Sequence, residues 1–328
     1  MKRLPVTLNS AVASGPKVVA LGGGHGLAST LTALRRMTDQ ITAVVGVADD
    51  GGSSGRLRSE FGILPPGDLR MALAALCGDD TWGRTWQRVI QHRFSGVGEL
   101  GGHSLGNLLI TALWEETGDP VIGLEWLGAL LEAQGRVLPC SVQPLEIVAQ
   151  VQGINAHAPD GITEVRGQVE VASTPGKVVS VTLEPARPIA CPEAISAMAV
   201  ADAIVLGPGS WFTSVLPHLL IPDLAQAIIE SPAKRIVVLN LAPYADQETA
   251  GIPVAEHLEF LRAAAPALRL DAVIADPHHV DDLGQLHAAC STFGAELIVE
   301  PVAHSGGRHP GSHDPDRLSA ALRSALLG

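Results

Sequence analysis

Apolar residues occur at two different spacings along the chain, which predicts strands alternating with helices. Val18–Leu21 is a short continuous apolar run that ends in three glycines. Leu27, Leu31 and Leu34 then recur at helical spacing, and Ile41–Val47 follows as a run rich in β-branched residues. A strand, a glycine turn, a helix and a second strand form a βαβ unit. Continuous apolar strands of this kind indicate a parallel sheet that is covered on both faces.

Helical and strand patterns continue along the rest of the chain. Between Asp68 and Trp114 the pattern is helical, apart from a glycine-rich break at residues 95–103. Further short apolar runs predict strands at Ala203–Leu206, Arg235–Leu241, Leu270–Ala275 and Glu296–Val302, and Asp316–Leu327 predicts a closing helix.

Residues 138–188 have a different pattern. Glu146–Val151 and Glu164–Val171 alternate between apolar and polar residues, and a Pro-Gly turn at 175–176 precedes Val178–Leu183. Alternation with turn residues predicts antiparallel hairpins. The expected architecture is therefore one α/β domain over residues 1–328, with a parallel sheet and a small antiparallel β excursion at about 138–188. Residues 1–16 are expected to form a flexible leader.

Composition narrows the classes of partner. The net charge of −12 disfavours a nucleic-acid-binding surface, and no basic patch longer than a few residues offsets it. No apolar run approaches the roughly 18 residues of a membrane span, so we expect no membrane insertion. The four cysteines are far apart in the sequence and predict free thiols in a reducing, cytoplasmic compartment. The sequence leaves a homo-oligomer open.

The first candidate loop follows the first strand and consists of Gly22, Gly23, Gly24, His25 and Gly26. A helix N-terminus presents unpaired N–H groups, and glycines let phosphate oxygens approach the backbone closely. The loop is not the dinucleotide fingerprint GxGxxG, because Leu27 stands where the third glycine is required. A tight strand–helix turn without a ligand is the alternative.

The second candidate loop follows the second predicted strand and contains Asp49, Asp50, Gly51, Gly52, Ser53 and Ser54. The adjacent carboxylates suit three tasks: binding Mg²⁺, accepting hydrogen bonds from ribose or sugar hydroxyls, or acting as a base. Mg²⁺ is therefore left open as a cofactor, with Asp49 and Asp50 as its candidate ligands. The alternative for each aspartate is helix capping before a turn.

The third candidate loop contains Gly207, Gly209 and Ser210 and follows the strand at 203–206. It repeats the arrangement of the first loop at a second strand end. In open α/β sheets, ligands bind at the carboxyl edge of the strands. The repetition predicts that both loops hold the phosphates of one nucleotide-type ligand.

Five further polar residues are candidates for ligand contacts. Arg56 and Arg70 suit fork-like contacts to phosphate, although ion pairing with local acids serves equally well. Asp68 precedes Arg70 in Leu-Pro-Pro-Gly-Asp-Leu-Arg. His103 and Asn107 precede an apolar helix, where Asn107 either contacts a ligand or caps the helix. His103 has no suitably spaced partner for a metal site.

Several of these segments together resemble a known family. ADDGGSSGRLR at 48–58, LPPGDLR at 64–70, GHSLGNLL at 102–109, GRVLP at 135–139 and VLGPGS at 205–210 occur in this order. They resemble the YvcK-type proteins, named gluconeogenesis or morphogenesis factors, in the superfamily of 2-phospho-L-lactate transferase (CofD-like). The resemblance extends from about residue 17 to 243, with a weaker tail to 318.

The resemblance implies a Rossmann-like three-layer sheet and a cytoplasmic protein that binds UDP-sugars such as UDP-N-acetylglucosamine. It also implies a role that links carbon metabolism to cell-wall synthesis and cell shape, with unidentified protein partners. Asn240 and Thr249 match the family pattern and join the candidate ligand-binding residues. The alternative is an Mg²⁺-dependent transferase like the phospholactyl-transferring members of the superfamily, and the resemblance establishes no reaction.

Two departures from the family pattern bear on ligand selectivity. His25 stands where the family usually has threonine, and the family's Pro-Gly turn after Asn240 is missing. Tyr244, the only tyrosine, lies in that segment. Base or sugar selectivity is therefore expected to differ from that of other members.

Overall fold

Strand β1 (Val18–Gly22) lies in the interior of a parallel sheet, between β2 (Ile41–Val45) and β7 (Ala203–Leu206). The computed structural model describes residues 15–155, 158–241, 249, 252–304 and 311–327. Most of the leader expected at 1–16 lies outside the described residues, as does Tyr244. Within these ranges, seven parallel strands form the large sheet in the order β10-β9-β8-β7-β1-β2-β3. The predicted Rossmann-like α/β class is confirmed.

Three of the remaining strands of the sheet match predicted apolar runs to within a few residues. They are β8 (Lys234–Val238), β9 (Ala272–Ala275) and β10 (Glu296–Val299). The fourth, β3 (Arg136–Pro139), was not predicted: its last two residues fell in the segment assigned to the antiparallel excursion, but it pairs parallel with β2 in the large sheet. All residues of β1 and β7 are buried, as expected for central strands with helices on both faces.

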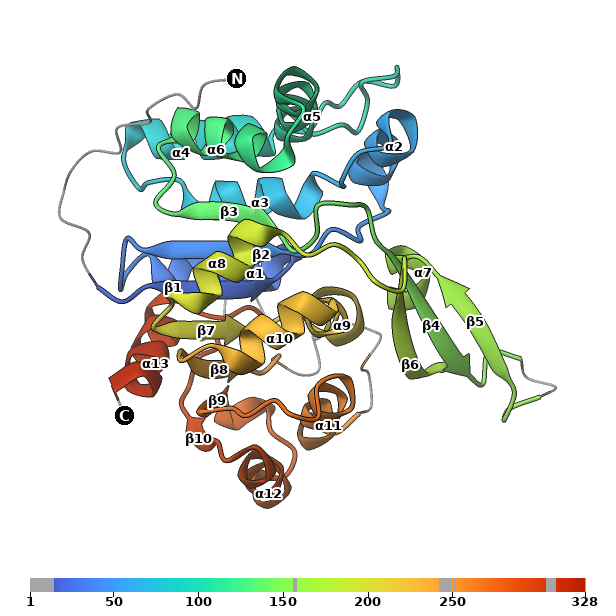
Figure 1. The fold of residues 1–328 in the computed structure, drawn as a ribbon, viewed down its shortest axis with the longest axis vertical. Helices are drawn as coiled ribbons and strands as arrows, with labels where there is room; N and C mark the ends of the chain where they lie inside the picture. The colour runs from blue at the N-terminus through green and yellow to red at the C-terminus, as the bar shows by residue number, and fades with distance from the viewer. Residues whose placement is uncertain (1–14, 156–157, 242–248, 250–251, 305–310, 328) are drawn as a thin grey trace.

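Helices cover both faces of the sheet (Figure 1). The first group packs around α1 and the strands β1 to β3: α1 (Gly24–Leu34), α2 (Gly52–Phe61), α3 (Gly67–Leu76), α4 (Thr81–Gln91), α5 (Leu105–Thr117), α6 (Pro120–Leu131) and α13 (Pro315–Leu327). The second group begins with α8 (Pro192–Ala199) and continues with η1 (Trp211–Val215), α9 (Pro217–Leu220), α10 (Pro222–Glu230), α11 (Val254–Ala264), η3 (Pro277–His279) and α12 (Leu283–Phe293). Figure 1 shows α8 and α10 on the near face of the sheet and α1 behind it.

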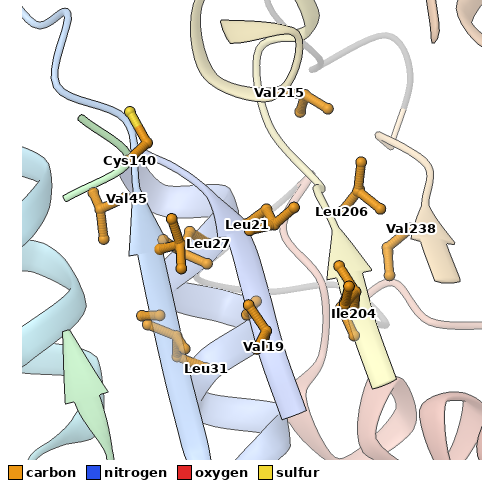
Figure 2. Packing of buried hydrophobic residues seen from close by; sticks show 14 of the residues in the cluster. Val19, Leu21, Leu27, Leu31, Val45, Cys140, Ile204, Leu206, Val215 and Val238 are labelled. Carbon is orange, nitrogen blue, oxygen red and sulfur yellow. The ribbon is translucent and has the colours of Figure 1, made fainter. Parts of the chain in front are cut away.

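The core forms where the apolar face of α1 meets the sheet. Leu27, Leu31 and Leu34, the residues that predicted the helix, are 0–1% exposed. Figure 2 shows Leu27 and Leu31 among the side chains of β1, β2 and β7, including Leu21 and Leu206. Burying one such side chain contributes about 1.5–3 kcal/mol. Because α1 begins within the first loop, packing of α1 against the sheet fixes the position of that loop.

The predicted antiparallel excursion is a three-stranded sheet that projects from the large one. Its strands are β4 (Glu146–Gln152), β5 (Ile162–Arg166) and β6 (Lys177–Glu184), in the order β5-β4-β6. We call residues 146–184 the arm. One prediction was wrong: alternation through Val171 predicted a strand, but the strand ends at Arg166 and α7 (Gln168–Ala172) follows. Gly167 between them has φ +88°, which ends the extended backbone.

Two expectations from composition can be compared with the structure. Cys77, Cys140, Cys191 and Cys290 are all buried free thiols, as the sequence predicts. Burial raises the pKa of the Cys140 thiol to about 12, so it stays protonated at neutral pH. Among the described residues, no helix is long and apolar enough to cross a bilayer.

Candidate ligand site at the carboxyl edge of the sheet

The two glycine-rich loops after β1 and β7 lie next to each other. Leu21 of β1 is paired with Leu206 of β7, and Gly22 is paired with Val45 of β2, so the three strands end at the same level. The chain leaves β1 toward β2 on one side, whereas β7 joins β1 on the other side from much later in the sequence. This position is the topological switch point of the sheet, where open α/β folds bind ligands.

The first and third loops touch through their backbones. A Cβ added to Gly26 would lie 2.1 Å from the carbonyl oxygen of Pro208 and 3.0 Å from Cα of Gly209. Only glycine fits at such a distance from a backbone atom. The hydroxyl of Thr30 in α1 also donates to the Gly207 carbonyl at 3.1 Å. The two loops therefore form one continuous surface rather than two separate turns.

Asn240 fixes the third loop. Its Oδ1 accepts from the Gly209 N–H, and its Nδ2 donates to the Gly209 carbonyl, both at 2.8 Å. Asn240 is 8% exposed, so both bonds are shielded from water. In this structure the amide of Asn240 positions the loop backbone.

Ser210 follows β7 at this end of the sheet, and Thr249 is the other remaining candidate from the second half of the chain. The carbonyl of Ser210 accepts from the N–H groups of Ser214 and Val215 and starts η1. The hydroxyl of Thr249 is buried and has no hydrogen-bond partner among the residues that the structure describes. Ser210 therefore has a backbone role here.

Asp49 and Asp50 face different parts of the molecule. Asp49 Oδ1 accepts from the Gly51 N–H at 3.0 Å, and its other oxygen lies 2.8 Å from where a Cβ on Gly67 would be. Asp50 accepts instead from the N–H of Val169 in α7 at 3.0 Å. The structure therefore separates the two carboxylates that the sequence places side by side.

Asp68 joins the first loop to the second. Its carboxylate accepts a hydrogen bond from the Gly24 N–H, and one of its oxygens lies 2.4 Å from where a Cβ on Gly23 would be. Burial raises the pKa of Asp68 to about 7, and the charge of Asp49 adds to that rise. An acid with a pKa near neutrality thus occupies the N-terminus of α1.

A polar network, buried except for Gln91, supports the second loop. The hydroxyl of Ser53 accepts from Asn107 Nδ2 at 3.0 Å and lies 3.0 Å from His103 Nδ1. Asn107 Oδ1 accepts from Arg70 Nε at 2.9 Å, and a further Arg70 nitrogen donates to Gln91. Burial lowers the pKa of Arg70 and also that of His103. These five side chains hold one another and set the position of Ser53 at the start of α2.

The other candidate residues are arranged around this edge. Arg56 is exposed, and it donates to the carbonyls of Gly101 and Glu99 in the loop before α5. Ser54 is buried, with its hydroxyl 2.3 Å from where a Cβ on Gly67 would be. His25 is exposed at the start of α1. Gly52, with φ +46° and open space around it, begins α2.

Helix N-termini and carboxylates lie together at this edge of the sheet. The N-termini of α1 and α2 present backbone N–H groups next to Asp49 and Asp68. Mg²⁺ in nucleotide sites uses one or two protein carboxylates together with phosphate oxygens, and the Asp49–Asp68 pair suits that donor set. In the described part of the chain, no three His, Cys, Asp or Glu side chains converge to hold a metal by themselves.

Sequence reasoning missed three contributors to this edge. Ser214 of η1 has its Oγ 3.4 Å from where a Cβ on Gly23 would be, yet it stands in an apolar segment without a motif. Gln91 and Val169 reach the site only through tertiary contacts. The one usable signal was Gly67 in the Pro-Pro-Gly-Asp motif, where the glycine permits the close packing of Ser54 and Asp49.

Comparisons of the sequence and the structure with known proteins point to one family. Residues 18–291 match the family described as 2-phospho-L-lactate transferase CofD. A "Putative gluconeogenesis factor" of Mycobacterium leprae is 48% identical over 318 residues, which cover 96% of this chain and 87% of the relative. The "Gluconeogenesis factor" of Bacillus subtilis is 35% identical over 267 residues, covering 81% of this chain and 80% of the relative. A UPF0052-family crystal structure from Bacillus halodurans superposes with a TM-score of 0.83 at 32% identity, covering 96% of this chain and 99% of that one.

Proposed function

The chain belongs to the CofD family, with curated relatives named gluconeogenesis factors, and from that premise we propose that it binds a nucleotide sugar of the UDP-N-acetylglucosamine type. The binding protein would act as a cytoplasmic regulator that links carbon metabolism to cell-wall synthesis and cell shape. The ligand, this cellular role and the compartment are parts of the proposal.

The contact between the first and third loops is the observation that carries the proposal. Gly26 lies against Pro208, and Asn240 holds Gly209, so the backbone surface at the switch point is built before any ligand arrives. A diphosphate needs N–H donors and close approach to a backbone; the first turn of α1 has N–H groups without intrahelical partners, and the glycines permit the close approach. Acidic side chains at its border suit the hydroxyls of ribose or a sugar as hydrogen-bond acceptors.

A thermal-shift screen of nucleotides and nucleotide sugars tests the proposal. A ligand at about one hundred times its Kd adds roughly 2.7 kcal/mol to the free energy of unfolding, and so raises Tm by several degrees. We expect UDP-N-acetylglucosamine to raise Tm more than NAD, ATP or a GDP-linked compound. A larger shift with NAD would end this proposal.

The Asp49–Asp68 pair favours a second candidate, the Mg²⁺-dependent transferase, because two neighbouring carboxylates suit a metal that also binds phosphate. Titration of wild type, Asp49→Asn and Asp50→Asn in Mg²⁺ and in EDTA separates the two. A binding protein without a catalytic metal keeps its affinity in EDTA. Wild-type affinity that collapses in EDTA, with Asp49→Asn indifferent to it, would put the transferase first.

A further inference from the structure

Asp50 and α7 form a structure that the ligand loops alone do not explain. Asp50 lies in the loop between β2 and α2, and its hydrogen-bond partner Val169 lies 119 residues later, in the arm. The second carboxylate oxygen of Asp50 lies 2.1 Å from where a Cβ on Gly167 would be. Any side chain at 167 would displace this carboxylate, so glycine is required there for two reasons, its φ of +88° and this contact.

The same contact places Val169 over the start of α2. Its Cγ2 lies 3.0 Å from where a Cβ on Gly51 would be, and Gly51 is the N-cap of α2. Val169 is nevertheless 49% exposed. Val169 therefore lies beside the N-terminus of α2, the end of the helix that attracts an anion, and keeps about half of its surface open to a ligand.

On its other side α7 is anchored to the third loop's helix. Val171 is fully buried, and α7 packs against η1, which starts directly after Ser210. The helix thus spans from the second loop to the third, with the first loop between them. Figure 1 shows α7 at the carboxyl edge of the large sheet, at the base of the projecting strands β4 to β6.

We propose that α7 is the outer wall of the nucleotide site, that Asp50 is the positioning residue that docks it, and that Val169 contacts the bound ligand. This inference rests on the proposed function. The three glycine loops form the floor and sides, and the arm supplies the remaining wall. Residues near Val169 would then contribute to ligand selectivity, although they lie more than 100 positions away from the second loop.

Charge substitutions at Val169 test the wall. Val169→Asp brings a negative charge to the phosphates and should raise the Kd for UDP-N-acetylglucosamine about fivefold or more, whereas Val169→Lys should lower it by a similar factor. Both effects should shrink at high salt. Val179 on β6 is 54% exposed, so Val179→Asp and Val179→Lys are matched controls that should leave Kd within about twofold. Kd values that do not differ between the Val169 variants would overturn the proposal.

Amide hydrogen exchange without ligand tests the role of Asp50. If Asp50 docks α7, Asp50→Ala should speed the exchange of the Val169 N–H in the free protein, and Asp50→Asn should do so less, because its amide oxygen still accepts. Asp50→Ala should also weaken nucleotide-sugar binding. Unchanged exchange at Val169 would refute the positioning role.

Inorganic pyrophosphate separates failure of this inference from failure of the proposed function. If wild type binds pyrophosphate but no nucleotide sugar, the proposed function fails, and the pyrophosphate Kd of the Val169 variants still decides whether α7 borders the site. If wild type binds neither, both ideas are wrong. If nucleotide sugar binds equally well to all Val169 and Val179 variants, only the wall is refuted.

Discussion

Gly26→Ala should separate the first and third loops, because its new methyl group would collide with backbone. The added carbon would lie 2.1 Å from the Pro208 carbonyl oxygen, and ordinary contact begins at 3.4 Å, so one loop must move by about 1.3 Å. Overpacking of this kind costs about 1–3 kcal/mol, and loss of the Thr30–Gly207 hydrogen bond costs about 1 kcal/mol more. Alanine in a helix regains about 1 kcal/mol relative to glycine.

The net expectation for Gly26→Ala is a loss of about 1–3 kcal/mol in the free energy of unfolding, or about 1.5–4 °C in Tm for a chain of this size. Differential scanning calorimetry at a single protein concentration measures it. The same variant should bind nucleotide sugar more weakly than wild type, because the shared backbone surface is displaced.

Two other glycines serve as controls for the effect of the methyl group itself. Gly24 has φ +57° and open space around its would-be Cβ, so Gly24→Ala should cost only about 1 kcal/mol of backbone strain. In α6, a Cβ on Gly128 would meet only Leu73 at 3.8 Å, so Gly128→Ala should stabilise by about 0.5–1 kcal/mol. If Gly26→Ala matched Gly128→Ala in Tm, the two loops would not be in contact and the reasoning would fail.

Two more predictions concern the carboxylate and the amide of the site. Folding raises the pKa of Asp68 from 3.8 to about 7, so the folded state binds this proton more tightly than the unfolded state. The protonated carboxyl therefore contributes its full stability below about pH 4, and this contribution is lost as pH rises through 7. Asp68→Asn should therefore be more stable than wild type by roughly 2–4 kcal/mol at pH 8 and little different at pH 4. Urea unfolding at both pH values measures the difference in free energy of unfolding. An equal difference at both pH values would refute the raised pKa of Asp68. Asn240→Ala removes both bonds to Gly209 and should cost about 1–3 kcal/mol, with weaker nucleotide-sugar binding, and Asn240→Asp should lose at least as much, because it places a carboxylate oxygen against the Gly209 carbonyl at a buried position. Thermal unfolding and calorimetric titration check both variants, and wild-type values for Asn240→Ala would show that the third loop holds itself.

Much of the fold could be predicted because its determinants are local in sequence. The leucines of α1 recur at helical spacing, and all three are buried against the sheet. The short β-branched run at Ile41 forms β2, an interior strand of the large sheet between β1 and β3. The prediction failed at Val169 and Val171, where alternation continued but a helix formed. The apolar periodicity does not depend on the two features that decided this structure. Gly167 has a positive φ that ends the strand, and the Asp50 carboxylate accepts a hydrogen bond from the Val169 N–H.

The candidate site was predictable in location but not in the task of each side chain. Glycine loops after β1 and β7 had to share one edge once the sheet was parallel, because the carboxyl ends of parallel strands lie together. The arginines show the limit. Arg70 suited phosphate contact by type, but in the structure it is buried and held by Asn107 and Gln91. Arg56 donates to loop carbonyls, a contact that no motif records.

The sequence by itself determined the succession of strands and helices along the chain, the parallel class of the large sheet and the glycine loops that follow its strands. Each of these follows from the local spacing of apolar residues and glycines. Tertiary structure alone decided that Asp49 faces the second loop while Asp50 faces the arm, and that Asp68 has a pKa near 7. The physical reason is that side-chain direction and burial depend on residues far along the chain, such as Val169 for Asp50. Proton affinity depends in turn on that burial and on charges brought close only by folding.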